Sequence, residues 1–382
     1  MKTLREVTVF TNGDSTKLST WSNVPYLFTQ TLIEKGIKVN RVDLTPDASL
    51  KNFWDKTMGR VARKLNKQTN FEYFRSRLHF MNVSSRIKKA IHAHRQTDIF
   101  IFLTFSFSAS KLTKKPVVLF GDWTYDYYFQ YYENRKPDLL EQQSIHRENS
   151  GIEIADLVLP LFPGIAAHMK KTYSNKNIHY LGNVINSVNT ISEAEALKAK
   201  ENSNELLFVG GPKYLAGALS LITAFGNLKK QNPLLKLHIV GMKEADIGIT
   251  LPTDVICYGY IDKGNDKERE LYYDLFKRAK AFINTTPKWG AFSATIEAMY
   301  FYNPVIVMPY DEFVETFGKQ IPFGVYCHEN TAEAIEKSIR TVFEHTDYNS
   351  VCIQANNAVK DYSWSAYIDK MIRLINALPK GD

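Results

Sequence analysis

The chain has 382 residues, which is too long for one ordinary hydrophobic core and fits two domains of about 180 residues each. Apolar residues make up 44% and charged residues 23%, which is typical of globular proteins and argues against long disordered regions. The three cysteines are widely spaced, so neither a disulfide framework nor a thiolate metal site is indicated. No apolar run approaches the roughly 18 residues of a membrane span. We therefore expect a cytoplasmic protein.

The net charge of +8 is concentrated in residues 51–97, which hold twelve Lys and Arg residues against Asp55 and Glu72, an excess of ten. Aromatic residues alternate with these charges. Such a surface is typical of proteins that meet an anionic membrane, nucleic acid or a phosphorylated acceptor. The alternative is a pair of solvated helices whose aromatic side chains face the core.

The first half begins with an alternating strand at 7–10, a glycine turn and a helix at about 26–35. A strand at 39–44, the basic helical region and apolar strands at 99–105, 117–120 and 157–161 follow. Strands that alternate with helices predict an α/β fold with a parallel, doubly wound sheet.

The second half repeats this scheme, with short apolar runs at 206–209, 237–240, 255–258, 281–284 and 305–308. Between them, apolar residues recur at helical spacing and are expected in the core; they are Leu219, Ile222 and Phe225 in one helix and Leu271, Leu275 and Ala279 in another. Glycine and asparagine interrupt the pattern at 180–190, which indicates a domain boundary. Ligands of two such sheets are expected in a cleft between their carboxyl ends.

The blocks NELLFVGG, KLHIVG, DVICYGYI, LYYDLFKRAKAFINTT and WGAFSATIEAMYFYNPVIVM, followed by DYSW, cover nearly all of 204–375. In order and spacing they resemble the retaining family 4 glycosyltransferases and their GT-B relatives. The resemblance implies two Rossmann-like domains facing a cleft, an acceptor domain at 1–185 and a donor domain at 186–364, with a C-terminal helix (365–382) that crosses back to the first. It also implies sugar transfer from a nucleoside diphosphate, for example UDP, with retention of configuration.

The segment AFINTTPKWGAFSATIEAM reads as a strand, a loop and a helix that starts near Ser293. Free backbone N–H groups and the positive end of the helix dipole would make this start an anion site suited to a diphosphate. Residues expected to contact the donor here are Trp289, Gly290, Ala291, Phe292, Ser293, Ala294 and Thr295.

Glu297 shares a helix face with Ser293. In the resembling family a glutamate at this position accepts hydrogen bonds from the donor ribose, and a carboxylate suits that role because it offers only acceptors. We therefore expect Glu297 to be a catalytic and donor-binding residue. A lone glutamate on a helix surface is the alternative.

Three positions depart from the family. Trp289 replaces the first of two paired glutamates, and Gly211 and Ala216 replace a phosphate-binding Arg and Lys. Lys213 is the nearest replacement cation, although it could be an ordinary exposed lysine. Gly210, with Gly211, allows close backbone approach to a phosphate.

The family places the nucleobase beside the loop after the third strand of this domain, here Tyr258, Tyr260 and Ile261. Either tyrosine could stack on a base, and either could instead be a core tyrosine.

In the first domain, Gly13 follows the first strand, where GT-B enzymes need a close turn, and Asp14 comes next as a candidate acceptor-binding residue. Asp122 and Trp123 lie just past another strand end. Asp122 is expected to orient or deprotonate the acceptor hydroxyl, and Trp123 to contact the acceptor. A helix N-cap is the alternative for Asp122.

The chain has no D-x-D pair and no cluster of His and Cys ligands, so no metal or other cofactor is expected. The favoured acceptor is a lipid-linked or cell-surface polysaccharide intermediate, reached by peripheral binding of 51–97 to the inner face of the membrane. Alternatives are glycosylation of nucleic acid, a nucleotide-sugar epimerase and a non-catalytic GT-B subunit that binds a sugar or a partner protein.

Overall fold

The computed structural model describes residues 4–286 and 292–378. The chain divides into two compact units. Unit 1 comprises residues 1–183 and 364–382, and unit 2 comprises residues 184–363.

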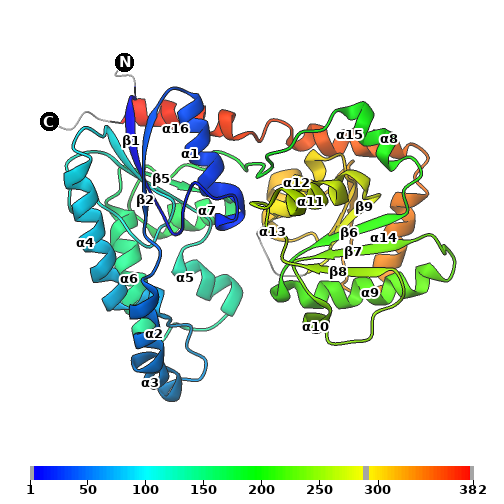
Figure 1. Ribbon diagram of the computed structural model, residues 1–382, viewed down its shortest axis with the longest axis horizontal. Helices are drawn as coiled ribbons and strands as arrows, with labels where there is room; N and C mark the ends of the chain where they lie inside the picture. Colours follow the sequence, from blue (N-terminus) through cyan, green and yellow to red (C-terminus); the bar gives the residue numbers. More distant parts are fainter. Residues whose placement is uncertain (1–3, 287–291, 379–382) are drawn as a thin grey trace. The chain divides into compact units, whose positions relative to one another are not determined.

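Unit 1 contains a parallel five-stranded sheet in the order β2-β1-β3-β4-β5 (Figure 1). The strands are β1 (Glu6–Thr11), β2 (Lys38–Asp43), β3 (Ile99–Phe102), β4 (Val117–Gly121) and β5 (Leu157–Pro160). β3, β4 and β5 are buried along their whole length, as the continuous apolar runs predicted.

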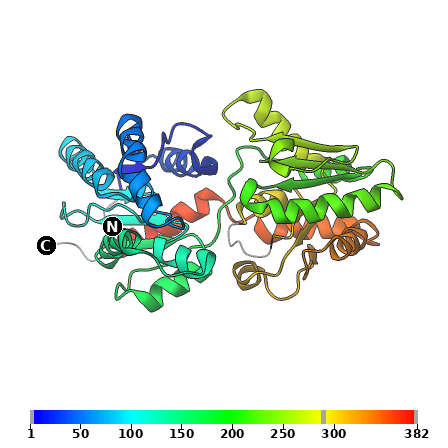
Figure 2. The same ribbon diagram turned by 90° about the horizontal axis from the view of Figure 1, so that it is seen from below.

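The helices of unit 1 cover both faces of its sheet (Figures 1 and 2). They are η1 (Thr20–Asn23), α1 (Val24–Glu34), α2 (Ala48–Lys56), α3 (Met58–Leu65), η2 (Tyr73–Arg75), α4 (Arg77–Ala93), α5 (Tyr125–Tyr127), η3 (Tyr128–Glu133), α6 (Leu139–Glu153), α7 (Pro163–Thr172) and α16 (Trp364–Ala377). The basic region thus contributes to three α-helices, α2, α3 and α4, whereas the alternative interpretation of its charges had a pair of helices.

The C-terminal helix α16 belongs to unit 1 although it follows unit 2 in sequence. Its Trp364 ring lies 5.8 Å from Phe28 of α1, and its Tyr367 ring lies 5.8 Å from Phe120 of β4. These aromatic contacts secure the end of the chain to the first sheet.

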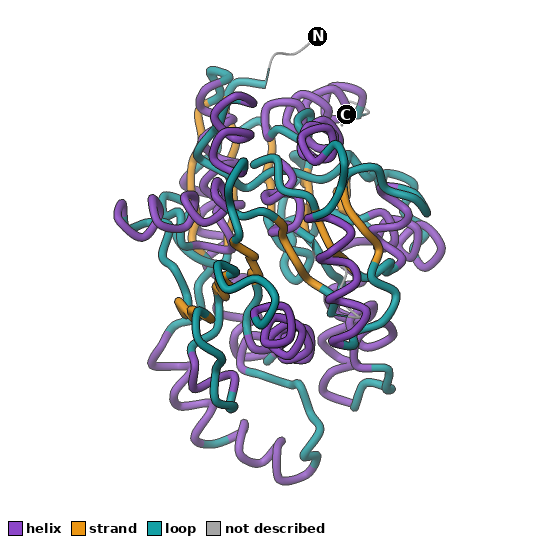
Figure 3. Tube along the Cα trace, turned by 90° about the vertical axis from the view of Figure 1, so that its right-hand side faces the viewer, coloured by secondary structure: helices purple, strands orange, loops and turns teal. Residues whose placement is uncertain are grey.

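Unit 2 contains a parallel six-stranded sheet in the order β11-β10-β9-β6-β7-β8. Figure 3 colours the strands of the chain orange among its purple helices. Its strands are β6 (Glu205–Val209), β7 (Lys236–Val240), β8 (Val255–Gly259), β9 (Ala281–Asn284), β10 (Val305–Val307) and β11 (Gly324–Tyr326). The sequence did not predict β11, because this edge strand has three partly buried residues and hence no apolar run.

The helices of unit 2 are α8 (Glu193–Lys200), η4 (Pro212–Tyr214), α9 (Leu215–Lys229), α10 (Glu244–Ile247), α11 (Asp266–Arg278), α12 (Ser293–Tyr300), α13 (Asp311–Phe317), α14 (Ala332–Phe343) and α15 (Tyr348–Val359). Alternate residues of β9 face opposite helix layers. Ala281 and Ile283 join a core cluster with α9 and α14, whereas the Phe282 ring lies 6.4 Å from Phe276 of α11. Two doubly wound α/β units, as predicted, are therefore present.

The core face of α11 differs from the prediction. Leu275 and Ala279 are buried, but Leu271 is 37% exposed. Tyr272, Tyr273 and Phe276 are buried instead. The aromatic side chains fill this layer, and their position brings a tyrosine hydroxyl to the candidate site described below.

Candidate functional site

In unit 2 the order of the strands reverses between β6 and β9: β7 and β8 follow on one side of β6, and β9, β10 and β11 on the other. Doubly wound sheets bind ligands outside the carboxyl ends of the strands at such a switch point. Gly210 and Gly211 follow β6 here, Lys213 lies just beyond them in η4, and residues 285–286 follow β9.

The backbones after β6 and β7 approach each other closely. Gly210 N donates to Val240 O at 2.9 Å, and Gly241 has a φ of +98°. A Cβ on Gly241 would lie 2.7 Å from Gly210 O, so a side chain there would collide with the backbone. Gly241 N in turn donates to Gly259 O at 2.7 Å, so both N–H groups are engaged, and what the glycines provide is an approach to the strand ends without side chains.

Helix α12 begins at Ser293, and its N-cap residue Phe292 makes no side-chain cap hydrogen bond. The first backbone N–H groups of the helix are therefore not capped by that side chain. Phe292 is buried and its ring lies 5.5 Å from that of Phe313, while Ser293 and Ala294 are half-buried and Thr295 is buried. Three expected donor contacts, Trp289, Gly290 and Ala291, lie outside the described residues.

Glu297, one turn into α12, is 3% exposed, so the alternative of a surface glutamate is wrong. Its Oε2 accepts a hydrogen bond from Tyr272 Oη at 2.8 Å, and Lys263 Nζ lies 3.6 Å from its Oε1. Oε1 accepts no hydrogen bond from any described residue. The site therefore contains a buried carboxylate oxygen with capacity to accept a ligand hydroxyl.

The protonation of Glu297 reflects opposing effects. Burial raises the pKa of Glu297, whereas the Lys263 charge and the Tyr272 hydrogen bond lower it. Burial and the Glu297 charge raise the pKa of Tyr272 well above its ordinary value, so Tyr272 remains a hydrogen-bond donor.

Lys263 was not predicted from the sequence. It follows β8 in the loop to α11, its side chain is 12% exposed, and its Nζ lies 4.5 Å from the centre of the Tyr272 ring. The sequence offers only a lysine in a polar loop, DKGND, and the tertiary fold brings it to the carboxylate.

The remaining residues expected to bind the donor, in η4 and at the end of β8, differ in how exposed their side chains are. Lys213 is exposed in η4, with its Nζ 5.0 Å from the Tyr214 ring centre. Tyr258 Oη is 2.9 Å from His238 Nδ1, so this half-buried tyrosine is tied to its own sheet. Tyr260 is 69% exposed and Ile261 is buried. Tyr260 is thus the tyrosine available for stacking.

Unit 1 has a pocket of about 250 Å³ at its own switch point, next to the carboxyl ends of β1, β3 and β4. Asp122 and Trp123 line it, together with Asn12 and Arg75. Asp122 Oδ1 accepts a hydrogen bond from Trp123 N at 2.8 Å. The N-cap of α5 is Thr124, whose side chain accepts from Tyr127 N, so the N-cap alternative for Asp122 is wrong.

Gly13 and Asp14 shape the turn after β1. Gly13 has a φ of +119°, and a Cβ there would lie 2.7 Å from Thr20 Cγ2. Asp14 Oδ1 accepts hydrogen bonds from Thr16 N at 2.9 Å and Thr16 Oγ1 at 2.7 Å. Asn12, which sequence reasoning missed, lines the pocket, whereas neither Gly13 nor Asp14 does.

In the described part of the chain, no three His, Cys, Asp or Glu side chains are grouped so as to hold a metal ion. None of its helices combines the length and apolar character that crossing a membrane requires.

Comparison with known proteins agrees with this architecture. Residues 189–359 match the model of the family described as glycosyl transferases group 1. No curated protein matches the chain in sequence.

Among solved structures, sucrose-phosphate synthase from Thermosynechococcus elongatus is similar over 98% of both chains, with a TM-score of 0.66 and 14% identity. A glycosyltransferase from Rickettsia africae ESF-5 is similar over 100% of both chains, with a TM-score of 0.64 and 14% identity. Anabaena HepE, solved in complex with UDP and glucose, is similar over 98% of this chain and 100% of the HepE chain, with a TM-score of 0.60 and 13% identity. At such identities the likeness concerns the fold.

Proposed function

We propose that this protein is a glycosyltransferase that transfers a sugar from a nucleoside diphosphate to an acceptor hydroxyl. The match of residues 189–359 to the glycosyl transferases group 1 family and the fold shared with solved glycosyltransferases support this proposal. The observation that carries the donor assignment is the buried Glu297, whose Oε1 accepts no hydrogen bond from the described residues. Such an oxygen suits a ribose hydroxyl.

The diphosphate would bind at the start of α12 and the glycine backbones after β6 and β7. Positive charge there stabilises the departing diphosphate, which is the main electrostatic demand of the reaction. Lys213 and Lys263 are the nearby cations we assign to this role, and they support transfer without a metal ion. Retention of configuration is proposed from the resemblance to the retaining family 4 enzymes.

UDP is the favoured nucleotide, because Anabaena HepE was solved with UDP and glucose. A thermal-shift screen of UDP, GDP, dTDP and CMP and their sugar conjugates, with and without magnesium, tests this. A ligand at 100 times its dissociation constant adds about 2.7 kcal/mol of stability. We expect a shift with one diphosphate series, unchanged by magnesium and reduced in Glu297→Gln. If no compound of the panel raises the melting temperature of the native chain, this result would count against a donor site.

On the acceptor side, we propose that Asp122 orients or deprotonates the acceptor hydroxyl in the pocket of unit 1. Asp122→Asn keeps the shape but removes the charge, so it should lower kcat while the dissociation constant of the donor stays unchanged. Asp126→Asn, which alters a nearby carboxylate outside the described pocket lining, serves as the control. Equal turnover of the native chain and Asp122→Asn would remove Asp122 from the mechanism.

We also propose that the acceptor is a lipid-linked or cell-surface glycan intermediate and that helix α3 docks on an anionic membrane surface. Met58, Val61 and Leu65 of α3 lie on one helix face and are 61%, 50% and 83% exposed. The adjacent side of α3 holds the buried Gly59 and Ala62, with Gly59 close to Trp54, and α2 and α3 project from unit 1 (Figure 1). An exposed apolar stripe flanked by lysine and arginine is typical of helices that lie in the membrane interface.

Sedimentation with phosphatidylserine vesicles tests the membrane proposal. Each well-placed Lys or Arg contributes about 1 kcal/mol to such binding. Leu65→Asp should weaken binding, whereas Leu234→Asp, which changes a leucine of unit 2 that is also largely exposed (71%), should not. No vesicle binding at low salt, or a preference for duplex DNA with steep salt dependence, would remove the membrane proposal.

A further inference from the structure

The pocket of unit 1 has the size and walls of a site for a single sugar ring. Its volume of about 250 Å³ lies just below the range of about 300–1,000 Å³ that is usual for drug-sized ligands. Trp21, Trp123 and two phenylalanines line it, and flat aromatic faces suit stacking against a sugar. Asn12 Oδ1 is buried and accepts no hydrogen bond from the described residues, so it can accept one from a sugar hydroxyl.

A partly buried arginine also lines this pocket. Arg75 Nη1 donates to Glu148 Oε2 at 2.9 Å and to Ser106 Oγ at 3.0 Å. Its guanidinium carbon lies 3.9 Å from the centre of the Tyr125 ring. Glu148 is 2% exposed, and its Oε1 accepts from Tyr125 N at 2.5 Å. The carboxylate and the ring therefore fix the orientation of the guanidinium.

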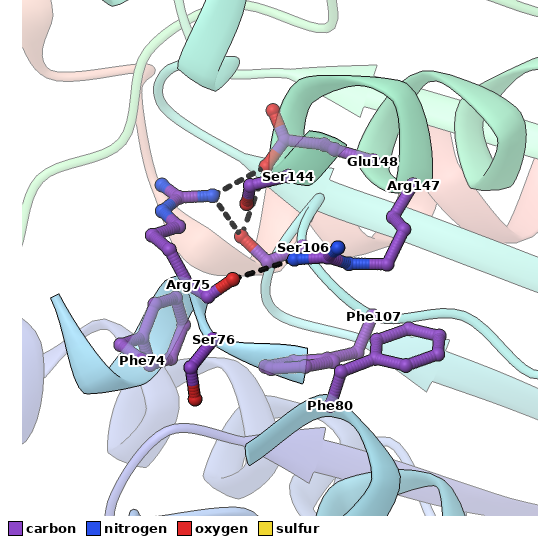
Figure 4. A pocket seen from close by; sticks show the side chains of 9 residues that line it. All are labelled: Phe74, Arg75, Ser76, Phe80, Ser106, Phe107, Ser144, Arg147 and Glu148. Atoms are coloured by element: carbon purple, nitrogen blue, oxygen red, sulfur yellow. Dashed lines mark hydrogen bonds and ion pairs between the residues drawn. The ribbon is translucent and has the colours of Figure 1, made fainter. Parts of the chain in front are cut away.

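The rest of the Arg75 guanidinium can still donate hydrogen bonds. Figure 4 shows Nη1 directed at Ser106 and Glu148, with the other two nitrogens turned away from them. Nε and Nη2 donate to no side chain or carbonyl in the described ranges 4–286 and 292–378. A planar fork of N–H donors matches the two oxygens of a carboxylate or phosphate.

A second arginine increases the local positive charge. Arg147 Nη2 donates to Arg75 O at 2.5 Å, and within the described chain no carboxylate lies within ion-pair distance of Arg147. Burial, with a further contribution from the neighbouring Arg75 and Arg77 charges, lowers the pKa of Arg147. Arg75 therefore has Glu148 as its carboxylate partner, whereas Arg147 adds a neighbouring positive charge that no carboxylate of the described residues pairs.

From these observations we infer that the unit 1 pocket binds a sugar that carries an oxyanion, a phosphate or a carboxylate, with Arg75 as the anion-binding residue and Asn12 and the tryptophans holding the ring. This inference rests on the proposed function in one respect, namely that the bound sugar is the acceptor. It narrows that acceptor to an anionic glycan. A sugar linked to lipid through phosphate and a uronic acid at a glycan end both carry the required group.

Titration calorimetry of the full chain with glucose, glucose 6-phosphate and glucuronate tests the inference. We expect the anionic sugars to bind at least tenfold more tightly than glucose, because a charge-assisted hydrogen bond contributes a factor of roughly ten or more. The preference between glucose 6-phosphate and glucuronate identifies phosphate or carboxylate as the recognised group. Equal affinity for all three sugars would overturn the inference.

Arg75→Gln should remove the preference for anionic sugars and leave glucose binding unchanged, whereas Arg77→Gln, an exposed neighbour, should change neither. Because Arg75→Gln leaves Glu148 buried without its cation, Arg75→Gln combined with Glu148→Gln provides a neutral pair that can fold. A double variant with a native circular dichroism spectrum that still prefers anionic sugars would overturn the inference.

Glu297→Gln separates this site from the donor site. Binding of anionic sugars should be unchanged in Glu297→Gln, and its loss there would place those sugars at the donor site and refute the inference. If nucleotides produce no thermal shift but the Arg75-dependent preference persists, the donor proposal fails while the pocket assignment stands.

Discussion

Replacing Lys263 with methionine should make donor affinity depend on pH. Lys263 Nζ lies 3.6 Å from Glu297 Oε1, and this charge opposes the effect of burial, which raises the pKa of Glu297. Methionine keeps an unbranched apolar stem but carries no charge. The pKa of Glu297 should therefore rise further in Lys263→Met.

The size of the effect follows from the distance. Two unit charges 3.6 Å apart attract by about 4–5 kcal/mol at an effective dielectric constant of about 20. If relaxation and water entry cancel half of that energy, about 2 kcal/mol remains, which is more than a tenfold change in the protonation equilibrium, so the pKa of Glu297 still rises. A protonated Glu297 loses its charge and part of its acceptor capacity, so donor affinity should fall as the pH decreases through the raised pKa.

Calorimetric titration of UDP, or of the nucleotide that the thermal screen selects, between pH 5.5 and 8.5 measures this effect. The affinity of Lys263→Met for the nucleotide should rise by roughly tenfold from pH 5.5 to pH 8.5. The affinity of the native chain should change less over the same range. Lys267→Met, which removes an exposed lysine from α11, should behave like the native chain. An equal loss of affinity at every pH in Lys263→Met would refute the reasoning, because Lys263 would then contact the diphosphate without controlling Glu297.

Three further predictions concern stability. Tyr272→Phe removes the 2.8 Å hydrogen bond to Glu297 and should lower the free energy of unfolding in urea by about 1–2 kcal/mol; an unchanged value would show that this bond contributes nothing net. Gly241→Ala should cost about 1–3 kcal/mol more than Gly248→Ala, because both have positive φ but only Gly241 has backbone within 4 Å of an added Cβ; equal melting temperatures would contradict this. Burial lowers the pKa of His79 to about 4, whereas its value in the unfolded chain is about 6.5. The unfolding free energy of the native chain should therefore fall by roughly 3 kcal/mol relative to that of His79→Phe as the pH falls from 7 to 4. A difference between the two unfolding free energies that stays constant with pH would refute this prediction.

The arrangement of strands could be predicted because parallel strands in a doubly wound sheet are buried on both faces and read as short apolar runs. The segments at 117–120, 237–240 and 281–284 all became strands. Where burial is incomplete the pattern disappears, as in the edge strand β11. The same limit explains Leu271, since helical spacing identifies a stripe but aromatic neighbours can occupy the core in its place.

The candidate sites depended more strongly on tertiary structure. The sequence alone determined that glycines follow β6 and β7 and that Glu297 lies one turn into a helix, because strand ends, turns and helix starts are local features. It could not show that Lys263 and Tyr272, 34 and 25 positions away from Glu297, meet its carboxylate, or that Arg75 of the basic segment pairs with Glu148. Those contacts join residues that no local periodicity relates, and only the packing of helices and loops around the carboxyl ends of the sheets brings them together.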